Sequence, residues 1–343
     1  MITAVCSEAE LRNDYITENI TTIYFGGGTP SLLTIEDCRL IMDRLYALFS
    51  VDAHAEITLE ANPDDINTEK LSAWKDAGIN RLSIGVQSFF ENDLEWMNRA
   101  HNASQAYKSI ELAKQAGFEN ITIDLIYGTP NLTDEDWLHN LETANKLGIS
   151  HLSCYALTVE PNTALQKMIA LHKKENVDVE KQSRQFELLM QWAAKNNFEH
   201  YEISNFAKPG FRSRHNSSYW QGKPYLGLGP SAHSYNGISR QWNIANNALY
   251  TKSIHEHIVP FEIETLTSTQ KINEYIMTGL RTVEGIQLHH LKNLSGEKIA
   301  ADIIIDAQKF IYQNLMESKN EALVLTQKGK LFADGIAADL FRI

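Results

Sequence analysis

A glycine-rich turn is the first part of this sequence whose residue types could do chemistry. Gly26, Gly27 and Gly28 are followed directly by Thr29 and Pro30. Three glycines let the backbone turn sharply and approach a ligand closely, and the threonine hydroxyl can donate a hydrogen bond. The turn lacks the Gly-Lys-Ser/Thr of a P-loop and the spacing of a dinucleotide fingerprint. It could hold a small polar group, or it could be only a tight turn.

Polar side chains at the ends of neighbouring expected strands form a second candidate group. Glu60 ends one strand, Gln87 ends the next, and Asp124 lies in the one after that. The carboxyl ends of strands in a barrel meet at one rim, where a carboxylate could accept from both hydroxyls of a ribose. The alternative is that Glu60 and Asp124 cap helices or pair with Arg81 or Arg99. In combination with the glycine turn, a ligand site is the better interpretation.

An aromatic segment containing a histidine, HNSSYW at 215–220, is the third candidate. The neutral imidazole of His215 is a good axial ligand for haem iron. The rings of Tyr219 and Trp220 supply flat apolar faces against which a porphyrin could stack. The alternative is a loop histidine held in an ordinary hydrogen-bond network.

Three further residues near this segment are candidates for the same ligand. His233 is a second candidate for the haem iron, and Arg212 and Arg214 could pair with propionate groups. For the two arginines, the alternative is a solvated surface charge.

The elements that must position these residues alternate along the first half of the chain. Short apolar or β-branched runs, typical of strands, lie at 21–25, 56–59, 81–86, 121–126 and 151–156. Helical periodicity lies at 35–49, 68–77, 103–116 and 134–147. Alternating βα units of this length predict an α/β fold with a parallel sheet and right-handed crossovers. Polar residues after several strands favour a barrel-like sheet with its site at that face.

The remaining patterns predict how the chain is divided. Residues 5–15 are predicted to be a helix, with no cap or strand before it, and 163–197 to be long helices. We expect three parts: a partial βα barrel over 1–200, a loop-rich aromatic segment over 201–262, and an α-rich, winged-helix-like domain over 263–343.

Composition excludes several classes of protein. The chain has 343 residues, of which 43% are hydrophobic and 22% are charged, and its net charge is −12. This charge offers no basic surface for nucleic acid. No apolar run approaches the roughly 20 residues needed to span a bilayer, and no signal pattern opens the chain. We expect a cytoplasmic protein and leave peripheral membrane contact open.

Three cysteines occur, Cys6, Cys38 and Cys154. Their spacing matches neither a disulfide framework nor a metal motif. Each is therefore expected to be a small, buried or half-buried apolar residue.

Four ordered motifs carry a family resemblance: IYFGGGTPSLL, LEANP, RLSIGVQSF followed by Asn98-Arg99-Ala100-His101, and IDLIYGTP. Together they resemble the radical-SAM proteins related to oxygen-independent coproporphyrinogen dehydrogenase, over essentially the whole chain. The intact HNxxYW motif at 215–220 is that of the haem chaperone branch. The resemblance implies a partial (β/α)6-type radical-SAM barrel.

The resemblance also implies roles for individual residues. The family's contacts with S-adenosylmethionine (SAM) fall on Gly27, Gly28, Thr29, Glu60, Gln87, Arg99 and Asp124. The last three belong to a second SAM site in the dehydrogenases, and its use in the haem chaperone branch stays open. The HNxxYW motif is implicated in haem binding, which implies His215 as the ligand of the iron, with Tyr219 and Trp220 beside it.

The chain departs from the family at its start. The family holds a [4Fe–4S] cluster with three thiolates in a CxxxCxxC loop after its first strand, and this sequence has neither. Cys6 maps beyond that loop. Either a start assigned at an internal methionine or a genuine loss of the cluster would explain this. We expect the strand at 21–25 to present an unpaired sheet edge that is prone to association.

Three functions compete. The first is a haem chaperone that hands haem to haem-dependent acceptors, respiratory proteins at the membrane among them, without cleaving SAM. The alternative is oxidative decarboxylation of coproporphyrinogen III, which would require the cluster. The third is a degenerate barrel with no ligand. Whether the chain is an enzyme and whether it forms a homodimer stay open.

Overall fold

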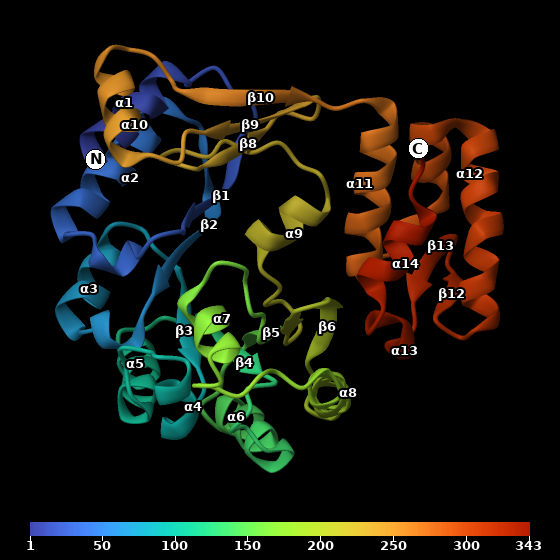
Figure 1. Cartoon of the computed structure of the whole chain (residues 1–343). Coiled ribbons are helices and arrows are strands. Elements are labelled where there is room, and N and C mark those ends of the chain that lie inside the picture. The colour runs from blue at the N-terminus through green and yellow to red at the C-terminus, as the bar shows by residue number, and fades with distance from the viewer.

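Seven strands form one curled sheet in the order β1-β2-β3-β4-β5-β7-β6 in the computed structural model, which describes residues 1–343 (Figure 1). The first five strands are parallel to one another: β1 (Ile20–Phe25), β2 (Val51–Ala61), β3 (Arg81–Gln87), β4 (Asn120–Tyr127) and β5 (His151–Ala156). The last two, β6 (Glu199–Glu202) and β7 (Asn205–Ala207), are antiparallel to their neighbours. The sheet therefore continues past residue 200, where the sequence placed a boundary.

Helices connect the parallel strands and cover the outer face of the sheet. They are α2 (Ile35–Leu48), α3 (Thr68–Asp76), α4 (Glu91–Trp96), α5 (Ala103–Gln115), α6 (Asp134–Lys146) and α8 (Val179–Lys195). Several begin at capping residues that the sequence provides, such as Thr34 and Asn102, each with a reciprocal capping box. The predicted α/β fold with a half-barrel sheet is confirmed, and so are all five predicted strands.

The two faces of the sheet differ in polarity. Side chains alternate along a strand, so that Ile57 and Leu59 of β2 pack under the helices while Glu56 and Glu60 lie on the other face. The neighbouring strands repeat this pattern, with Ile84 and Ile123 in the same apolar core. The concave inside of the half-barrel is therefore lined by polar side chains, and any site inside it is built from them.

The N-terminal helix α1 (Ile2–Leu11) begins and ends earlier than the predicted helix over 5–15. It ends at Arg12, whose backbone is no longer helical and whose guanidinium lies 3.4 Å from Glu8 and packs over the ring of Tyr15. Glu8 is fully buried and accepts hydrogen bonds from the Gly229 N–H and from Asn243 and Tyr250. The start of the chain is thus tied to the segment after residue 225.

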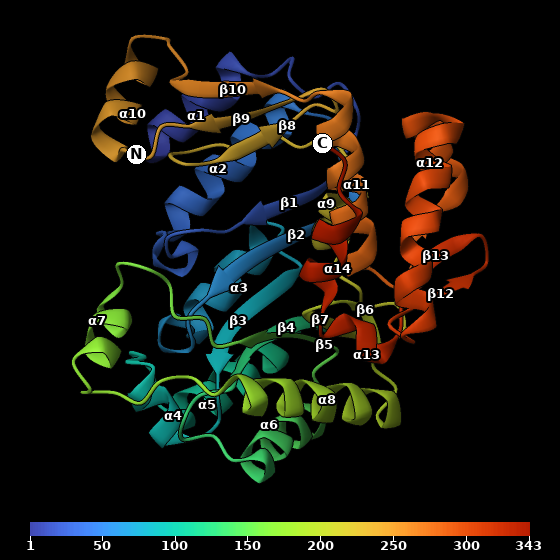
Figure 2. The same cartoon turned by 45° about the vertical axis from the view of Figure 1, so that its right-hand side comes forward.

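The segment 201–262 is more regular than the loop-rich prediction. It contains α9 (Arg214–Trp220), α10 (Asn247–His255) and a sheet in the order β10-β9-β8, built from β8 (His233–Tyr235), β9 (Ser239–Asn243) and β10 (Phe261–Thr265). Figure 2 shows this sheet beside α1 and α10, and Figure 1 shows α9 between the first strands of the main sheet and α11 (Ser268–Arg281). Each antiparallel strand is short, which is why its pattern was not recognised.

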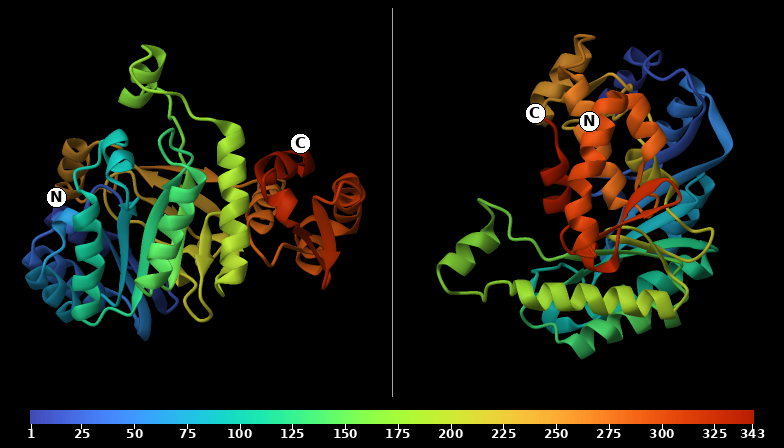
Figure 3. Two further views of the ribbon diagram at one scale, coloured as in Figure 1. Left: turned by 90° about the horizontal axis from the view of Figure 1, so that it is seen from below. Right: turned by 90° about the vertical axis from the view of Figure 1, so that its right-hand side faces the viewer.

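The helical prediction over 163–197 resolves into two helices. The short α7 (Ala164–Ala170) has no buried residue and stands away from the rest of the molecule, whereas α8 packs along the sheet (Figure 3). Asp178 separates them because its carboxylate accepts from two N–H groups at the start of α8.

The C-terminal part has its own apolar core. It consists of α11 (Ser268–Arg281), β11 (Ile286–Gln287), α12 (Leu288–Tyr312), β12 (Met316–Lys319), β13 (Ala322–Leu325), α13 (Gln327–Lys330) and α14 (Ala333–Leu340). A small sheet in the order β11-β13-β12 packs with these helices, as a winged-helix-like arrangement requires. None of the helices of the protein is both long and apolar enough to cross a membrane.

Candidate functional site

The glycine turn after β1 reaches the carboxylate at the end of β2. The N–H of Gly27 donates to Glu60 Oε2 at 3.2 Å, and the hydroxyl of Tyr24 donates to Glu60 Oε1 at 2.7 Å. Gly27 and Gly28 have φ of 72° and 60°, and a Cβ on either would meet nothing within 4 Å. These two glycines are therefore needed for the turn, and the space beside them is open to a ligand. Thr29 follows them directly, before the next helical turn.

Gln87 and Arg99 converge at the end of β3. A Cβ on Gly85 would lie 3.0 Å from Nε2 of Gln87 and 3.5 Å from Nη2 of Arg99, so the missing side chain makes room for both. Gln87 has a φ of 67°, which turns the chain sharply at the strand end. Arg99 Nη2 lies 3.5 Å from Asn62 Oδ1 at the end of β2, and burial lowers the pKa of the guanidinium.

Asp124 of β4 lies in the same electrostatic environment as Glu60. Burial raises the pKa of Asp124 to about 7, with the negative charge of Glu60 adding to the effect, and Ser153, Arg81 and Arg99 oppose it. The protonated form of Asp124 is therefore favoured more than that of an exposed aspartate. The structure brings together all the strand-end residues for which the sequence predicts a SAM site.

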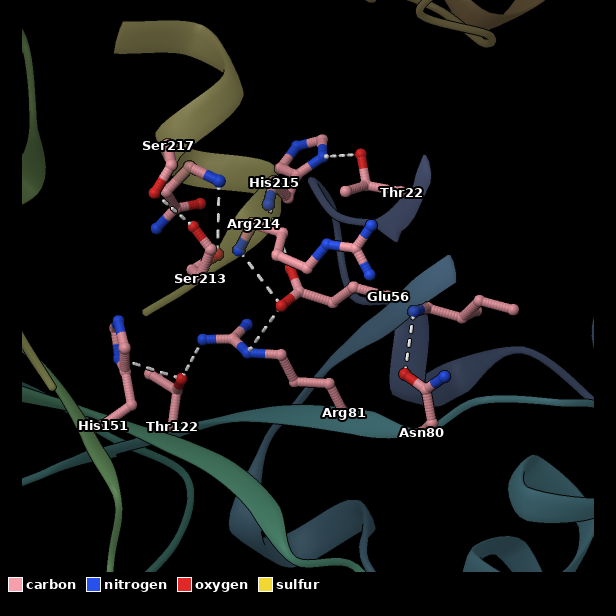
Figure 4. Close-up of polar contacts among 12 residues, drawn as sticks. Thr22, Glu56, Asn80, Arg81, Thr122, His151, Ser213, Arg214, His215 and Ser217 are labelled. Carbon is pink, nitrogen blue, oxygen red and sulfur yellow. Dashed lines mark hydrogen bonds and ion pairs between the residues drawn. The ribbon is translucent and has the colours of Figure 1, made fainter. Parts of the chain in front are cut away.

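His215 lies in α9, which the barrel holds by its first turn. Glu56 accepts hydrogen bonds from the N–H groups of Arg214 and His215 at 3.1 and 3.0 Å, and Ser213 accepts from Asn216 N at 3.2 Å (Figure 4). A short helix has few bonds of its own, so these caps decide where it begins and how it is directed. Sequence reasoning did not identify Glu56.

The imidazole of His215 packs between aromatic rings. It stacks on Tyr24 with centroids 4.4 Å apart and planes at 15°, and Tyr219 meets it edge to face at 4.9 Å. Its Nδ1 lies 3.3 Å from Oγ1 of Thr22, while Nε2 has no hydrogen-bond partner and is not fully buried. Burial, together with the positive charge of Arg81, lowers the pKa of His215 to about 4. The ring is therefore neutral at physiological pH, with one nitrogen held and the other free.

A chain of buried polar contacts runs under α9 across four strands. Arg81 is 2% exposed, faces Glu56 at 3.9 Å and donates to Thr122. Thr122 Oγ1 lies 3.0 Å from Nδ1 of His151. Figure 4 shows these side chains pointing into the barrel toward α9.

Tyr201 closes this chain of contacts. Nε2 of His151 lies 2.7 Å from the Tyr201 hydroxyl, which accepts from the N–H of Ser213 at 3.3 Å. The chain of contacts therefore begins at Glu56, which accepts from the first turn of α9, and ends at Ser213, the residue before α9. Alternating polar residues inside otherwise apolar strands were the signal in the sequence that could have identified this group.

The other two residues of the aromatic motif point in different directions. Tyr219 is half-exposed and its ring also contacts Tyr225 at 4.6 Å. Trp220 faces the C-terminal domain, where the guanidinium of Arg281 lies 5.2 Å from its ring. The indole N–H of Trp220 is buried without a partner.

The remaining candidates for the haem ligand lie elsewhere or are already paired. His233 is exposed on β8, its ring 6.3 Å from that of Trp242, and no hydrogen bond or ring contact joins it to α9. Arg212 forms ion pairs with Glu199 and Glu284. Arg214 Nη1 donates to the carbonyl of His54 at 2.6 Å. The role of these arginines toward propionates stays a prediction.

The three cysteines are free, buried and in different elements. No three histidine, cysteine or carboxylate side chains converge in a way that could hold a metal ion. The thiolates of this chain therefore do not fit an iron–sulfur cluster, which needs three or four of them together.

Comparison with known proteins identifies the family. Residues 8–144 match the radical SAM superfamily, and residues 266–332 match the HemN C-terminal domain. The heme chaperone HemW of Bacillus subtilis is 33% identical over 320 residues, which cover 93% of this chain and 84% of that protein. The HemW of Lactococcus lactis is 34% identical over 315 residues, 91% of this chain and 82% of that protein. The chain belongs to the HemW family. The predicted family membership is thereby confirmed.

A solved structure shows the same fold. Coproporphyrinogen III oxidase (HemN) from Escherichia coli, a radical SAM enzyme, superposes with a TM-score of 0.83 over 99% of this chain and 82% of that one, at 21% identity. The strand-end residues lie inside the radical SAM match, whereas 215–220 lies between the two matched domains. The alignments with the HemW relatives extend over more than nine-tenths of the chain.

Proposed function

We propose that this protein binds haem through His215 and delivers it to haem-dependent acceptor proteins. The observation that carries the proposal is the state of His215: a neutral ring, held at Nδ1 and on its face, with Nε2 free. A haem ligand needs such a nitrogen lone pair. The names of the HemW relatives support haem as the cargo.

The surroundings of His215 suit a porphyrin. Tyr219 is the half-exposed aromatic side chain next to the histidine, and Tyr225 continues the aromatic surface. Flat rings beside the ligand add apolar contact area to the iron bond. The same proposal includes delivery of haem in the cytoplasm, with peripheral contact to acceptors at a membrane. It also includes formation of a homodimer.

The glycine turn and Glu60 would hold SAM. Gly27, Gly28 and Thr29 offer an open backbone turn to a polar group, and Glu60 offers carboxylate oxygens to ribose hydroxyls. Gln87, Arg99 and Asp124 lie at the same rim and would extend that site. SAM bound to a [4Fe–4S] cluster supplies a radical in this superfamily, and the three thiolates needed are not among the cysteines of this chain.

Haem titration tests the proposal. Wild-type protein mixed with haem should give a shifted Soret band with one equivalent bound, and His215→Ala should lose it. His233→Ala is the matched control, because it removes an exposed histidine from another element. No shift at stoichiometric haem, or an unchanged shift in His215→Ala, would overturn the role of His215.

The second candidate function is the dehydrogenase reaction, favoured by the fold shared with HemN. Because the cysteines of this chain do not supply the three thiolates, the test uses the protein extended at its N-terminus by a segment with CxxxCxxC. It would be reconstituted anaerobically with iron and sulfide and given SAM, a reductant and coproporphyrinogen III. Decarboxylated product would support this function. Haem binding without product supports the chaperone.

A further inference from the structure

Tyr24 contacts both candidate sites with the two ends of one side chain. Its hydroxyl donates to Oε1 of Glu60 at 2.7 Å, and its ring lies against His215 at 4.4 Å. Gly27 N fixes the other oxygen of Glu60 at 3.2 Å. A single side chain thus joins the carboxylate at the glycine turn to the imidazole that faces haem.

The hydrogen bond of Tyr24 fixes the hydroxyl end of its ring. The phenol oxygen lies on the axis about which the ring turns, so this bond sets where the axis points, while the contact of the ring face with His215 sets the plane. Burial and the charge of Glu60 raise the pKa of Tyr24, so that the hydroxyl keeps its proton and continues to donate. The stacked contact with His215, with centroids 4.4 Å apart, depends on the ring axis keeping this direction.

We propose that Tyr24 is a positioning residue that couples the carboxylate of Glu60 to the imidazole of His215. The inference rests on the proposed function, because it concerns the orientation of the same haem ligand. A group with vicinal hydroxyls that binds Glu60 competes with, or reorients, the hydroxyl of Tyr24. The change reaches His215 through the shared ring face, without any contact between that group and the haem.

A four-protein cycle tests the coupling: wild type, Tyr24→Phe, Glu60→Ala and the double variant. Tyr24→Phe keeps the ring and removes only the donor. Each single variant should weaken haem binding about threefold to tenfold, as for groups that act through one network. The double variant should bind haem as tightly as the single variant that has the lower haem affinity. A broadened Soret band in the single variants should report the less ordered histidine.

Two control variants separate the hydrogen bond from charge and from general loss of a hydroxyl. Glu60→Gln keeps an acceptor oxygen for Tyr24 and loses the one that accepts from Gly27, so its haem affinity should lie closer to wild type than that of Glu60→Ala. Tyr46→Phe removes a hydroxyl from an exposed tyrosine of α2 and should change nothing. A thermal melt of each variant shows whether it is folded. If Glu60→Ala does not fold, the haem affinity of Tyr24→Phe alone decides whether the coupling exists.

The outcomes separate this inference from the function on which it rests. Haem binding that is insensitive to His215→Ala defeats the proposed function. Binding that depends on His215 but is equal in wild type and Tyr24→Phe, or losses that simply add in the double variant, overturn the coupling alone.

Discussion

Nδ1 of His215 lies 3.3 Å from the hydroxyl oxygen of Thr22, on the concave face of β1. When Nδ1 carries the ring proton, it donates to this oxygen and the lone pair of Nε2 is left for a metal. A histidine that ligates a metal commonly donates its second N–H in this way, which fixes both tautomer and orientation. If His215 ligates haem iron as proposed, Thr22 would be the hydrogen-bond partner that orients this ligand.

Replacing Thr22 by valine should weaken haem binding about tenfold, because loss of such a partner commonly costs tenfold to a hundredfold in metal affinity. Valine has nearly the same shape, so that packing is kept. Titration of the Soret band measures the change. Thr21→Val is the control, since Thr21 is exposed on the other face of the same strand. Equal affinity in both variants would show that the Thr22 contact has no role.

Haem binding should persist at acidic pH. The pKa of His215 is lowered to about 4, whereas an ordinary histidine titrates near 6.5, so the proton competes with iron only below about pH 5. The unfolded chain takes up this proton first. The contribution of His215 to the free energy of unfolding therefore falls as pH drops from about 6.5 toward 4. Soret absorbance between pH 8 and about 3, with circular dichroism to monitor folding, should stay constant down to about pH 5 and fall only below it. Loss of haem near pH 6.5 would contradict the buried, neutral histidine.

Much of the fold could be predicted from the sequence because its βα alternation is local. The strand runs and helix caps, such as Thr34, are encoded within a few residues. The predicted bounds of a helix are less accurate where residues distant in the sequence contact its end. Arg12, for example, leaves α1 to bond Gln241 at 2.7 Å, and no local signal predicts that contact.

The sequence predicts which residue types form the candidate site, but it predicts only in part which of them lie next to one another. Glu60 and His215 belong to recognisable motifs, but nothing local indicates that 213–216 packs against β1 and β2. The hydrogen bonds of Glu56 to α9 span more than 150 residues. Tyr24 and Thr22 were missed for the same reason, since each acts only through a partner brought near by the barrel.

Glu56 should be important for stability as well as for the direction of α9. Glu56→Ala leaves the guanidinium of Arg81 buried without its carboxylate and removes two caps, which should cost about 3 kcal/mol of the free energy of unfolding. Urea denaturation measures it. Glu56→Gln keeps one of the two acceptor oxygens for α9 and should lose less than Glu56→Ala. Adding Arg81→Met to Glu56→Ala removes the unpaired charge and should recover part of the loss. A cost below about 1 kcal/mol in Glu56→Ala would mean that the site rearranges or admits water.

Arg281 should hold the C-terminal domain on the barrel. It pairs with Glu202 of β6 at 3.1 Å and with Asp334 of α14 at 3.2 Å, and its guanidinium covers Trp220. Arg281→Ala leaves the nearly buried carboxylate of Glu202 without its cation, at a cost of about 2 kcal/mol or more. Hydrogen–deuterium exchange should rise in both α9 and α11. Lys309→Ala, which breaks an exposed ion pair with Asp339 in the same domain, is the control. Faster exchange confined to α11 would show that α9 does not depend on the docked domain.

The edge of the main sheet should govern self-association of this chain. β1 pairs with β2 on one side only, so its other side presents free backbone N–H and C=O groups. The side chain of Thr21 in this strand is exposed. Such an edge is a template for strand pairing between copies, and a lysine on it opposes that pairing. Light scattering at rising protein concentration should show association of the wild type and less of it in Thr21→Lys.

Gln313→Lys adds the same charge at an exposed position after α12 and should associate like the wild type. Because the chain carries a net charge of −12, this control separates blocking of the edge from a general change in repulsion. A wild type that stays monodisperse at high concentration would show that the edge is protected in solution.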